Sequence, residues 1–390
     1  MTQETGGLYA ADGVNVSAGD RFSEFAAGKS RETWGASPFV RVSDLSNGSF
    51  RGPRSIYFVG LPQDTTFTAA ADGIGTKVGL ITPAGFHTYA ARDLVAMTCG
   101  DITRYGGIPL TFSSVLDVST LGEPGSKTFQ AFEQLLSGAR DAALNQDVVL
   151  QTGETAELGT FVGSEDPDAV VKFNWAGFAF GAYHPKAMIT GEHLAPGQTI
   201  IALREFGFRS NGISMVRKAF RLKYGPEWWN HPAAANDIRA AAQPSTLYDR
   251  FLVEANGWKS GAFKNRIPVT CLAHITGGGI PGKFGEDLLF RAGLSAKLDG
   301  LYEPPSIMKR CAEYRGLEGE AVDAETFYRT WNGGQGVLAV MDSEDVERFL
   351  DLAQDFGIAA KVCGQIFKAD SPVLQIESPY HGETVEFHPQ

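Results

Sequence analysis

The sequence predicts a two-domain protein of the mixed α/β class, and three observations lead to this prediction. The chain has 390 residues, and since a domain usually holds roughly 100 to 200 residues, two or three domains are expected. Hydrophobic residues make up 43% of the chain and charged residues 20%, which supplies enough apolar side chains for globular cores. Short β-prone runs alternate with helical patterns in both halves, and no repeat of fixed period organises them.

The first half alternates strand and helix patterns. The β-prone runs lie at 55–62, 66–71, 109–118, 147–154 and 173–183. The helical patterns lie at 89–105 and 129–145, and the second places its apolar residues on one helical face. A segment rich in Pro and Gly then suggests a crossing between domains. We therefore place the boundary near residue 187, with predicted domains at 1–187 and 188–390.

The second half repeats this organisation. A strand is predicted at 199–207, and a helix opens at Ser210. The polar, Trp-bearing stretch at 223–243 indicates an insertion or a surface excursion. Residues 270–293 indicate a strand, a glycine loop and a helix, and the chain closes with a strand at 334–342 and a helix capped by Ser343.

The charge balance excludes several classes of protein. Lys and Arg number 34 against 45 Asp and Glu, a formal net charge of −11, and the few close basic pairs are more typical of a solvated helix face than of a nucleic-acid site. No apolar run approaches the ~18 residues of a membrane span, and the first residues lack a signal-peptide pattern. Four widely spaced cysteines form no CxxC motif. We expect a cytoplasmic protein with reduced thiols and neither nucleic-acid nor membrane partners.

Glycine is the outlier of the composition, with 46 residues or about 12% against a typical usage of about 7%. One glycine-rich segment, ADGIGTK at 71–77, follows a β-prone run and carries Asp72 and Lys77 near its two ends. Its backbone N–H groups could approach an anion. It matches neither a Walker A loop nor a dinucleotide motif, and an ordinary glycine turn explains such a segment about as often as a phosphate loop.

Three acids stand where a magnesium–nucleotide site would need them. Asp117 and Glu154 come at the ends of predicted strands, and Mg²⁺ prefers oxygen ligands that it shares with phosphates. Asp101 follows a mostly apolar helical segment, so its carboxylate must be solvated, capped or paired with a cation. Each acid is weak evidence alone, and only together do they suggest a site.

Two further segments combine polar residues with helix starts. In HITGGGIPGK, residues 274–283, three glycines precede a predicted helix whose free N–H groups could hold an anion, although a GGG is commonly just a sharp turn. In FRSNGIS, residues 208–214, a helix N-cap is the simpler interpretation and a substrate clamp the alternative. No GxSxG or HExxH motif occurs, so glycine loops and acids favour phosphate handling.

The order of these motifs resembles one enzyme family, the phosphoribosylformylglycinamidine cyclo-ligases, also called aminoimidazole ribonucleotide (AIR) synthetases. The resemblance runs nearly end to end. Its elements are YAADGVNVSAGDRF (9–22), ADGIGTK (71–77), DLVAMTCGDI (93–102), GETAEL (153–158), GFRSNGISMVRK (207–218), AHITGGGIP (273–281) and YRTWNGGQG (328–336).

The resemblance implies a fold and a reaction. It implies an N-terminal α/β domain whose sheet forms a barrel across a homodimer, a C-terminal α/β domain, and ATP bound in a cleft between them. The implied reaction uses ATP and Mg²⁺ to activate the amide oxygen of formylglycinamidine ribonucleotide. An internal nitrogen then closes the ring and gives aminoimidazole ribonucleotide, ADP and phosphate. Such chemistry needs charge neutralisation and positioning more than a protein nucleophile.

The resemblance also implies roles for individual residues. The catalytic residues would be Asp72, Lys77, Asp101 and His274. The metal ligands would be Asp72, Asp101 and Asp117. The nucleotide would bind Gly73, Gly75, Thr76, Lys77 and Glu154. The ribonucleotide substrate would bind Arg209, Ser210, Asn211, Gly212, Gly277, Gly278, Gly279 and Asn332.

The chain also departs from the family pattern. A glycine-rich flap expected after Lys29 reads KSRETWGASPFVRV, and Ala71 replaces a threonine. Gly100 replaces the asparagine before Asp101, and Arg209 replaces the usual histidine before SNG, which exchanges a titratable group for a fixed cation. Two alternatives therefore stay open: a diverged relative that phosphorylates another amide or carbonyl, and a non-catalytic nucleotide-binding homologue, against which the retained acids argue.

Overall fold

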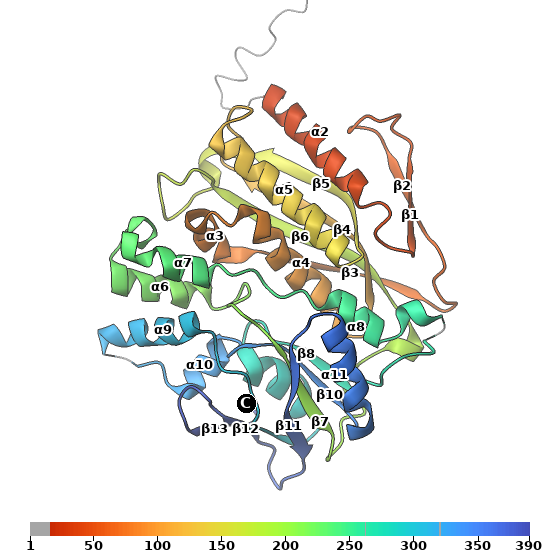
Figure 1. The fold of residues 1–390 in the computed structure, drawn as a ribbon, viewed down its shortest axis with the longest axis vertical. Coiled ribbons are helices and arrows are strands. Elements are labelled where there is room, and N and C mark those ends of the chain that lie inside the picture. Colours follow the sequence, from red (N-terminus) through yellow and green to blue (C-terminus); the bar gives the residue numbers. More distant parts are fainter. Residues whose placement is uncertain (1–15, 262, 320) are drawn as a thin grey trace, which may run out of the picture. The chain divides into compact units, whose positions relative to one another are not determined.

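The computed structural model describes residues 16–261, 263–319 and 321–390, which form two compact units (Figure 1). Unit 1 contains the chain up to residue 99 together with 109–182, and unit 2 contains 100–108 and 183–390. Residues 9–15 of the first family motif lie outside the described residues. Both units combine helices with sheets, which confirms the predicted mixed α/β class.

Unit 1 is built around a four-stranded sheet with the strand order β3-β6-β4-β5. Its strands are β3 (Thr66–Gly73), β4 (Ile108–Val118), β5 (Val149–Glu157) and β6 (Phe173–Tyr183). A separate antiparallel pair is formed by β1 (Val40–Asp44) and β2 (Arg54–Phe58). The helices are α2 (Val16–Glu32), α3 (Val78–Ala84), α4 (His87–Thr103), whose last residues belong to unit 2, and α5 (Lys127–Asn145).

Helix α5 shows how local sequence sets an element of unit 1. Ser126 lies just before the helix, and its hydroxyl accepts a hydrogen bond from the backbone N–H of Phe129 at 3.1 Å. Phe129, Phe132 and Leu135 recur at helical spacing and are buried. The predicted helix at 129–145 is confirmed, with two additional residues at its start.

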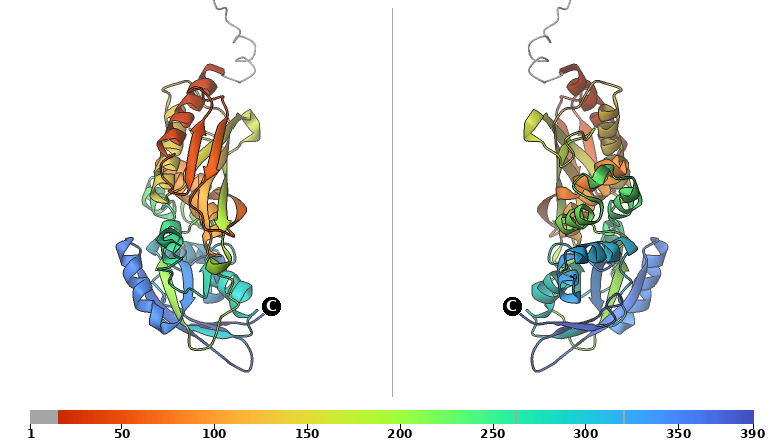
Figure 2. Two further views of the ribbon diagram at one scale, coloured as in Figure 1. Left: turned by 90° about the vertical axis from the view of Figure 1, so that its right-hand side faces the viewer. Right: turned by 90° about the vertical axis from the view of Figure 1, so that its left-hand side faces the viewer.

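The sheet of unit 1 has two different faces. Helices α2 and α5 cover one face, as the side views in Figure 2 show, and the buried Phe112 lies on β4. On the other face, Phe67 and Phe178 are about half exposed, at 50% and 46%. Phe67 also stacks with Phe180 at 5.6 Å between ring centroids. An apolar surface therefore lies on the side that these helices leave uncovered.

Unit 2 contains a seven-stranded mixed sheet with the order β13-β12-β9-β11-β7-β10-β8. Its strands are β7 (Thr199–Arg204), β8 (Cys271–His274), β9 (Ser295–Leu298), β10 (Gln335–Met341), β11 (Ala360–Phe367), β12 (Leu374–Glu377) and β13 (Thr384–Phe387). Its helices are α6 (Ile213–Tyr224), α7 (Ala235–Ala241), α8 (Asp249–Ala255), α9 (Ser306–Arg315), α10 (Ala324–Thr330) and α11 (Val346–Asp355), with a π-helical segment at Pro281–Leu289.

The core of unit 2 lies on both faces of this sheet. Strand β10 is buried at every position and pairs antiparallel with β7 and β8. Phe251 of α8 and Phe349 of α11 pack on one face, in a cluster with Ala339 of β10. The π-helical segment lies on the opposite side of the sheet from α11 (Figure 2). None of the helices described is both long and apolar enough to cross a bilayer.

Three local predictions in unit 2 differ from the structure. Helix α6 begins at Ile213 after Gly212, because Gly212 adopts the left-handed conformation (φ 66°) and ends the preceding turn. Ser343 starts a short 3₁₀ turn and makes no capping bond, since Asp345 precedes helix α11. Residues 223–243 form no loose excursion, because Trp228 is buried and α7 packs against α9.

Candidate functional site

The glycine loop of unit 1 leaves the end of strand β3. Gly73 closes the strand, and its backbone N–H donates to Oδ1 of Asp72 at 2.6 Å. Gly75 has a positive φ of 61° and opens a 3₁₀ turn that reaches Lys77. Gly75 and Thr76 are exposed, so this loop offers accessible backbone donors at the end of a strand, next to a carboxylate.

Lys77 is completely buried at the end of this loop. Its Nζ lies 2.6 Å from Oδ1 of Asp93 in helix α4, and the two side chains are 0% and 1% exposed. A buried ammonium needs such a carboxylate, because an unpaired charge in the interior is strongly unfavourable. The pair therefore ties the glycine loop to α4, and the ammonium group is not exposed toward a ligand.

Two more predicted acids lie on neighbouring strands of the same unit. Strands β4 and β5 run parallel, with Asp117 opposite Ala156 and Val115 opposite Glu154. Asp117 and Glu154 are thus two positions apart along paired strands. Oδ2 of Asp117 accepts a hydrogen bond from Asn174 of β6 at 3.4 Å.

Glu154 also lines a cavity of about 270 Å³ within unit 1. Two arginines that the sequence analysis did not single out, Arg51 and Arg54, line it as well. Arg51 pairs with Asp20 at 2.5 Å. Within the described residues, Nε of Arg54 is buried without a hydrogen-bond partner. Cations beside apolar residues of α2, α5 and β4 form a cavity whose chemistry suits an anionic organic ligand.

The GGG segment at 277–279 and the SNG segment at 210–212 lie in contact within unit 2. Oδ1 of Asn211 lies 3.6 Å from the position that a Cβ at Gly277 would occupy, so the two segments are in contact. The carbonyl of Gly212 accepts a hydrogen bond from the indole of Trp331 at 3.2 Å. Asn332 is buried and donates to the carbonyl of Gly207 at 2.9 Å. Three of the predicted substrate segments thus meet within one unit.

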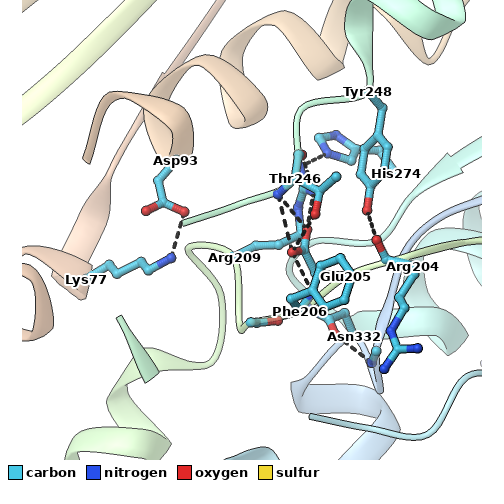
Figure 3. Close-up of polar contacts among 12 residues, drawn as sticks. Lys77, Asp93, Arg204, Glu205, Phe206, Arg209, Thr246, Tyr248, His274 and Asn332 are labelled. Carbon is cyan, nitrogen blue, oxygen red and sulfur yellow. Dashed lines mark hydrogen bonds and ion pairs between the residues drawn. The ribbon is translucent and has the colours of Figure 1, made fainter. Parts of the chain in front are cut away.

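Arg209 forms the centre of a buried polar cluster in unit 2 (Figure 3). Its Nη1 donates to Oε2 of Glu205 at 2.8 Å, and its Nη2 contacts Nε2 of His274. The side chains of Arg209 and Glu205 are 1% and 0% exposed. The guanidinium therefore binds internal partners, whereas the resemblance implied that Arg209 contacts substrate.

His274 ends the buried strand β8 and is only 4% exposed, although the sequence suggested a place inside a polar glycine loop. Burial, followed by the positive charge of Arg209, holds the pKa of His274 well below its usual range. Nδ1 of His274 is buried and has no partner among the described residues.

Asp101 and Ser210 occupy less enclosed positions. The carboxylate of Asp101 in unit 2 is 43% exposed and lies 3.7 Å from Nε of Arg104. Ser210 follows Arg209 directly, and its hydroxyl has no partner within the described part of the chain. Gly278 and Gly279 both have positive φ angles and precede the π-helical segment.

The predicted Mg²⁺ ligands are carboxylates, which are suitable ligands for this ion. They do not form a metal-binding cluster among the described residues. Across 16–261, 263–319 and 321–390, no group of three or more His, Cys, Asp or Glu side chains could hold a metal. Mg²⁺ usually binds one or two carboxylates, phosphate oxygens and water, so a three-residue protein cage is not required. Asp72 and Asp117 in unit 1 and Asp101 in unit 2 remain candidate oxygen donors.

Sequence reasoning missed the partners that hold the candidate residues in place. Asp93 carried a usable signal, because an acid in an otherwise apolar helical run must be paired. Glu205 followed an apolar strand and offered the same signal. Arg51 and Arg54 carried none, since isolated arginines in a loop are ordinarily solvated.

Comparison with known proteins agrees with this architecture. Two family models match the chain: "AIR synthase related protein, N-terminal domain" at residues 56–181 and "AIR synthase related protein, C-terminal domain" at residues 195–377. A phosphoribosylformylglycinamidine cyclo-ligase of Staphylococcus aureus (strain Newman) is 27% identical over 378 residues, which cover 94% of this chain and 98% of that protein.

Solved structures share the fold at low sequence identity. The hydrogenase maturation protein HypE of E. coli has a TM-score of 0.56 at 15% identity, over 94% of this chain and 95% of its own. A HypE structure in complex with ATP has a TM-score of 0.53 at 12% identity, with coverages of 86% and 87%. PurL of T. maritima complexed with FGAR has a TM-score of 0.52 at 14% identity, over 85% of this chain and 48% of that chain.

The two family models follow one another along the sequence and together match most of it, in the order that the motifs predict. The chain therefore belongs to the AIR synthase related family.

Proposed function

We propose that this protein is an ATP- and Mg²⁺-dependent cyclo-ligase that converts formylglycinamidine ribonucleotide to aminoimidazole ribonucleotide, ADP and phosphate. The observation that carries the proposal is the alignment with the S. aureus cyclo-ligase, which spans 98% of that enzyme. The family motifs that the chain retains contribute acids and glycine loops in both units. Their chemistry suits phosphoryl transfer, in which positioning and charge neutralisation supply most of the rate.

The residues of unit 1 would bind ATP. The N–H groups of the loop from Gly73 to Thr76 would donate to phosphate oxygens, and Lys77 would keep the loop in place through Asp93. Glu154, Arg51 and Arg54 line a cavity that suits another part of an anionic ligand. Because the whole chain carries a net charge of −11, local cations and backbone donors must supply the attraction for ATP.

Mg²⁺ would neutralise charge on the phosphates when it binds with ATP. Asp72, Asp101 and Asp117 would hold it through carboxylate oxygens. In unit 2, the N–H groups and side chains of the substrate segments would bind the ribonucleotide and orient its amide oxygen. These residues are Ser210, Asn211, Gly212, Gly277, Gly278, Gly279 and Asn332.

We also propose that the protein is a homodimer whose sheets meet through the uncovered face of unit 1. Half-exposed Phe67 and Phe178 on that face support this proposal, since a second copy would bury both. Sedimentation equilibrium at several protein concentrations tests it. A monomer at the highest concentration would contradict it.

A diverged enzyme that phosphorylates another amide or carbonyl is the second candidate. The burial of Arg209 against Glu205 and His274 favours this alternative, because a fully buried guanidinium is poorly placed to contact a substrate. Both candidates require ATP, and they differ in the acceptor.

The deciding experiment supplies purified protein with ATP, Mg²⁺ and formylglycinamidine ribonucleotide. The cyclo-ligase should release ADP and form a diazotisable aminoimidazole. The Asp101→Asn variant should lose most of this turnover, because a neutral amide is a weaker Mg²⁺ ligand. Glu344→Asn, a substitution in the 3₁₀ turn before α11, serves as a control for loss of an exposed acid.

Two results would change the assignment. Phosphate release with other amides, without the aminoimidazole, would replace the cyclo-ligase with the diverged enzyme. Unchanged turnover in Asp101→Asn would remove that residue from the metal site.

A further inference from the structure

Two positions at which the chain departs from the family pattern contact the same side chain. The resemblance implies a histidine at the position of Arg209 and an asparagine at the position of Gly100. Arg209 contacts Nε2 of His274, and Gly100 faces the same ring at Cε1, the carbon between its two nitrogens. The two departures therefore form one local arrangement within unit 2.

The contact with Arg209 fixes where the proton of His274 lies. A guanidinium donates hydrogen bonds and accepts none, and it stays protonated at any pH at which the protein is folded. Nε2 of His274 must therefore accept, which leaves the proton on Nδ1. A second proton at Nε2 would place an N–H against the N–H of Arg209.

Glu205 holds the guanidinium in this orientation. Its carboxylate accepts from Nη1 of Arg209 at 2.8 Å, from the backbone N–H of Phe206 at 2.9 Å and from the hydroxyl of Thr246 at 3.1 Å. Arg209 also has a left-handed backbone (φ 55°), which is uncommon for a residue with a side chain. Such strain persists where surrounding contacts determine it.

Gly100 makes room for the ring on its other side. A Cβ at position 100 would lie 2.7 Å from Nδ1 of His274 and closer still to Cε1, so any larger residue would displace the imidazole. Thus the ring can sit between Arg209 and the backbone of α4 only because position 100 carries no side chain.

Positively charged groups from three neighbouring segments all lower the pKa of His274. Arg209 comes from the loop after β7, Arg104 from the turn after α4 and Lys283 from the π-helical segment, and all three positive charges disfavour a protonated His274. The negative charge of Glu205 is directed at Arg209. Buried Asp249 interacts with Arg209 and accepts from Thr103.

We propose that Gly100 and Arg209 jointly hold His274 as a neutral imidazole with its proton on Nδ1, so that Arg209 is a positioning residue. His274 then carries its one proton on the buried Nδ1, which has no partner among the described residues, and takes no proton in the reaction. The state of the ring follows from the geometry alone, whereas its consequence for turnover rests on the proposed function. The nitrogen that closes the ring must give its proton to another acceptor.

The first test is ¹⁵N NMR of the full-length protein with labelled histidine, recorded between pH 5 and 8. His274→Asn identifies the signal. We expect a protonated Nδ1, an unprotonated Nε2 and no titration of His274 over this range. A protonated Nε2, or a titration midpoint near 6.5, would overturn the proposal.

Variants separate a positioning role from a merely structural one. Arg209→Gln should let His274 titrate or exchange tautomers, whereas Arg204→Gln, which removes a nearby arginine outside this cluster, should leave the signal unchanged. If Arg209→Gln does not fold, a double-mutant cycle that measures the free energy of unfolding tests the contact between Gly100 and His274. Gly100→Ala should destabilise the wild-type protein. It should not destabilise the His274→Ala variant, because the imidazole that the new Cβ would overlap is absent there. Equal destabilisation in both backgrounds would contradict the contact.

Turnover provides a separate readout. An acid–base histidine of ordinary pKa would make the rate fall about fivefold from pH 6.5 to 5.5. We expect no such fall from His274 in the wild type and a shifted pH profile in Arg209→Gln. Absence of any turnover with formylglycinamidine ribonucleotide would refute the proposed function, while the NMR result would still decide the state of the ring.

Discussion

Each unit contains a fully buried cation, and the two cations are held in different ways. In unit 1, Lys77 pairs with Asp93 between a glycine loop and helix α4. In unit 2, Arg209 binds Glu205 and His274 from a residue with left-handed backbone. Lys77 lies at the end of the glycine-rich segment 71–77, and Arg209 lies in the loop after β7.

The difference shows how a point charge and a planar cation shape their surroundings. An ammonium group is a compact point charge, and one nearby carboxylate can compensate it. Lys77 and Asp93 are close enough to form such an ion pair. A guanidinium has five donors in a fixed fork, so it organises several acceptors at once. Glu205 keeps donors from Phe206 and Thr246 even without Arg209. We expect loss of the cation to be worse in unit 1, because Lys77 and Asp93 bring two fully buried charges into direct contact at 2.6 Å.

Lys77→Met should give the largest loss of stability. It leaves the carboxylate of Asp93 buried without its cation, which typically costs about 3–5 kcal/mol. Arg209→Met should cost less, about 2–3 kcal/mol, because Glu205 retains other hydrogen bonds. Chemical denaturation followed by tryptophan fluorescence measures both.

Two controls sharpen this comparison. Lys297→Met removes an ion pair with Glu377 in which both side chains are 45% exposed, so its effect on stability should be far smaller than that of Lys77→Met. Adding Asp93→Asn to Lys77→Met should recover part of the loss, since the uncompensated charge disappears. A loss for Lys77→Met no larger than for Lys297→Met would show that the buried pair is not important for the fold.

The glycine loops of the two units give the next contrast. Gly75 and Gly279 have nearly equal φ angles, 61° and 60°, but a Cβ at Gly279 would overlap the carbonyl oxygen of Tyr328. A Cβ at Gly75 would meet nothing within 4 Å among the described residues. Gly279→Ala should therefore cost about 2–4 kcal/mol, from strain plus overlap.

Gly75→Ala is the matched variant. It should cost only about 1–2 kcal/mol, because the left-handed backbone is its only penalty. Thermal unfolding of the two variants side by side measures the difference. Equal losses would mean that the backbone near Tyr328 moves easily to make room.

Much of the fold was predictable because periodicity and capping act locally. The strand at 173–183 was predicted with the bounds that the structure has, since aromatic and small apolar residues dominate this β-prone run. The start of α6 was predicted three residues too early, because Ser210 looked like a cap and the φ of Gly212 cannot be read from residue types. The strands β11, β12 and β13 were not predicted, since they depend on pairing with distant strands.

The candidate site was less accessible to sequence reasoning. Motif order predicted candidate residues, but the partners of Lys77 and Arg209 depend on which helix and strand pack beside them. The resemblance implied site roles for Lys77 and Arg209, and their burial against Asp93 and Glu205 cannot be derived from a linear motif. The roles of the remaining residues stay predictions until ligands are tested.

The smallest expected effect on stability concerns a third buried ionisable group, Asp249 in unit 2. Its Oδ1 accepts from the hydroxyl of Thr103 at 2.7 Å, and burial raises its pKa to about 6. In the unfolded chain the carboxyl titrates near 3.8. Between these values the native state keeps a proton that the unfolded state has lost, so stability falls as the pH rises, by at most about 1.4 kcal/mol per pH unit.

Asp249→Asn should remove this slope, because an amide does not titrate. The stability difference between variant and wild type should therefore move in favour of the variant by about 1–2 kcal/mol between pH 4 and 6. Asp299→Asn, whose carboxylate is 51% exposed, should follow the wild type across the same range. A pH-independent difference for Asp249→Asn would show that this carboxyl is ionised like one in solvent. An ionised carboxylate would then be stable in the interior of unit 2 without a cation in direct contact. The contrast with Asp93, which is paired directly with Lys77, would become weaker.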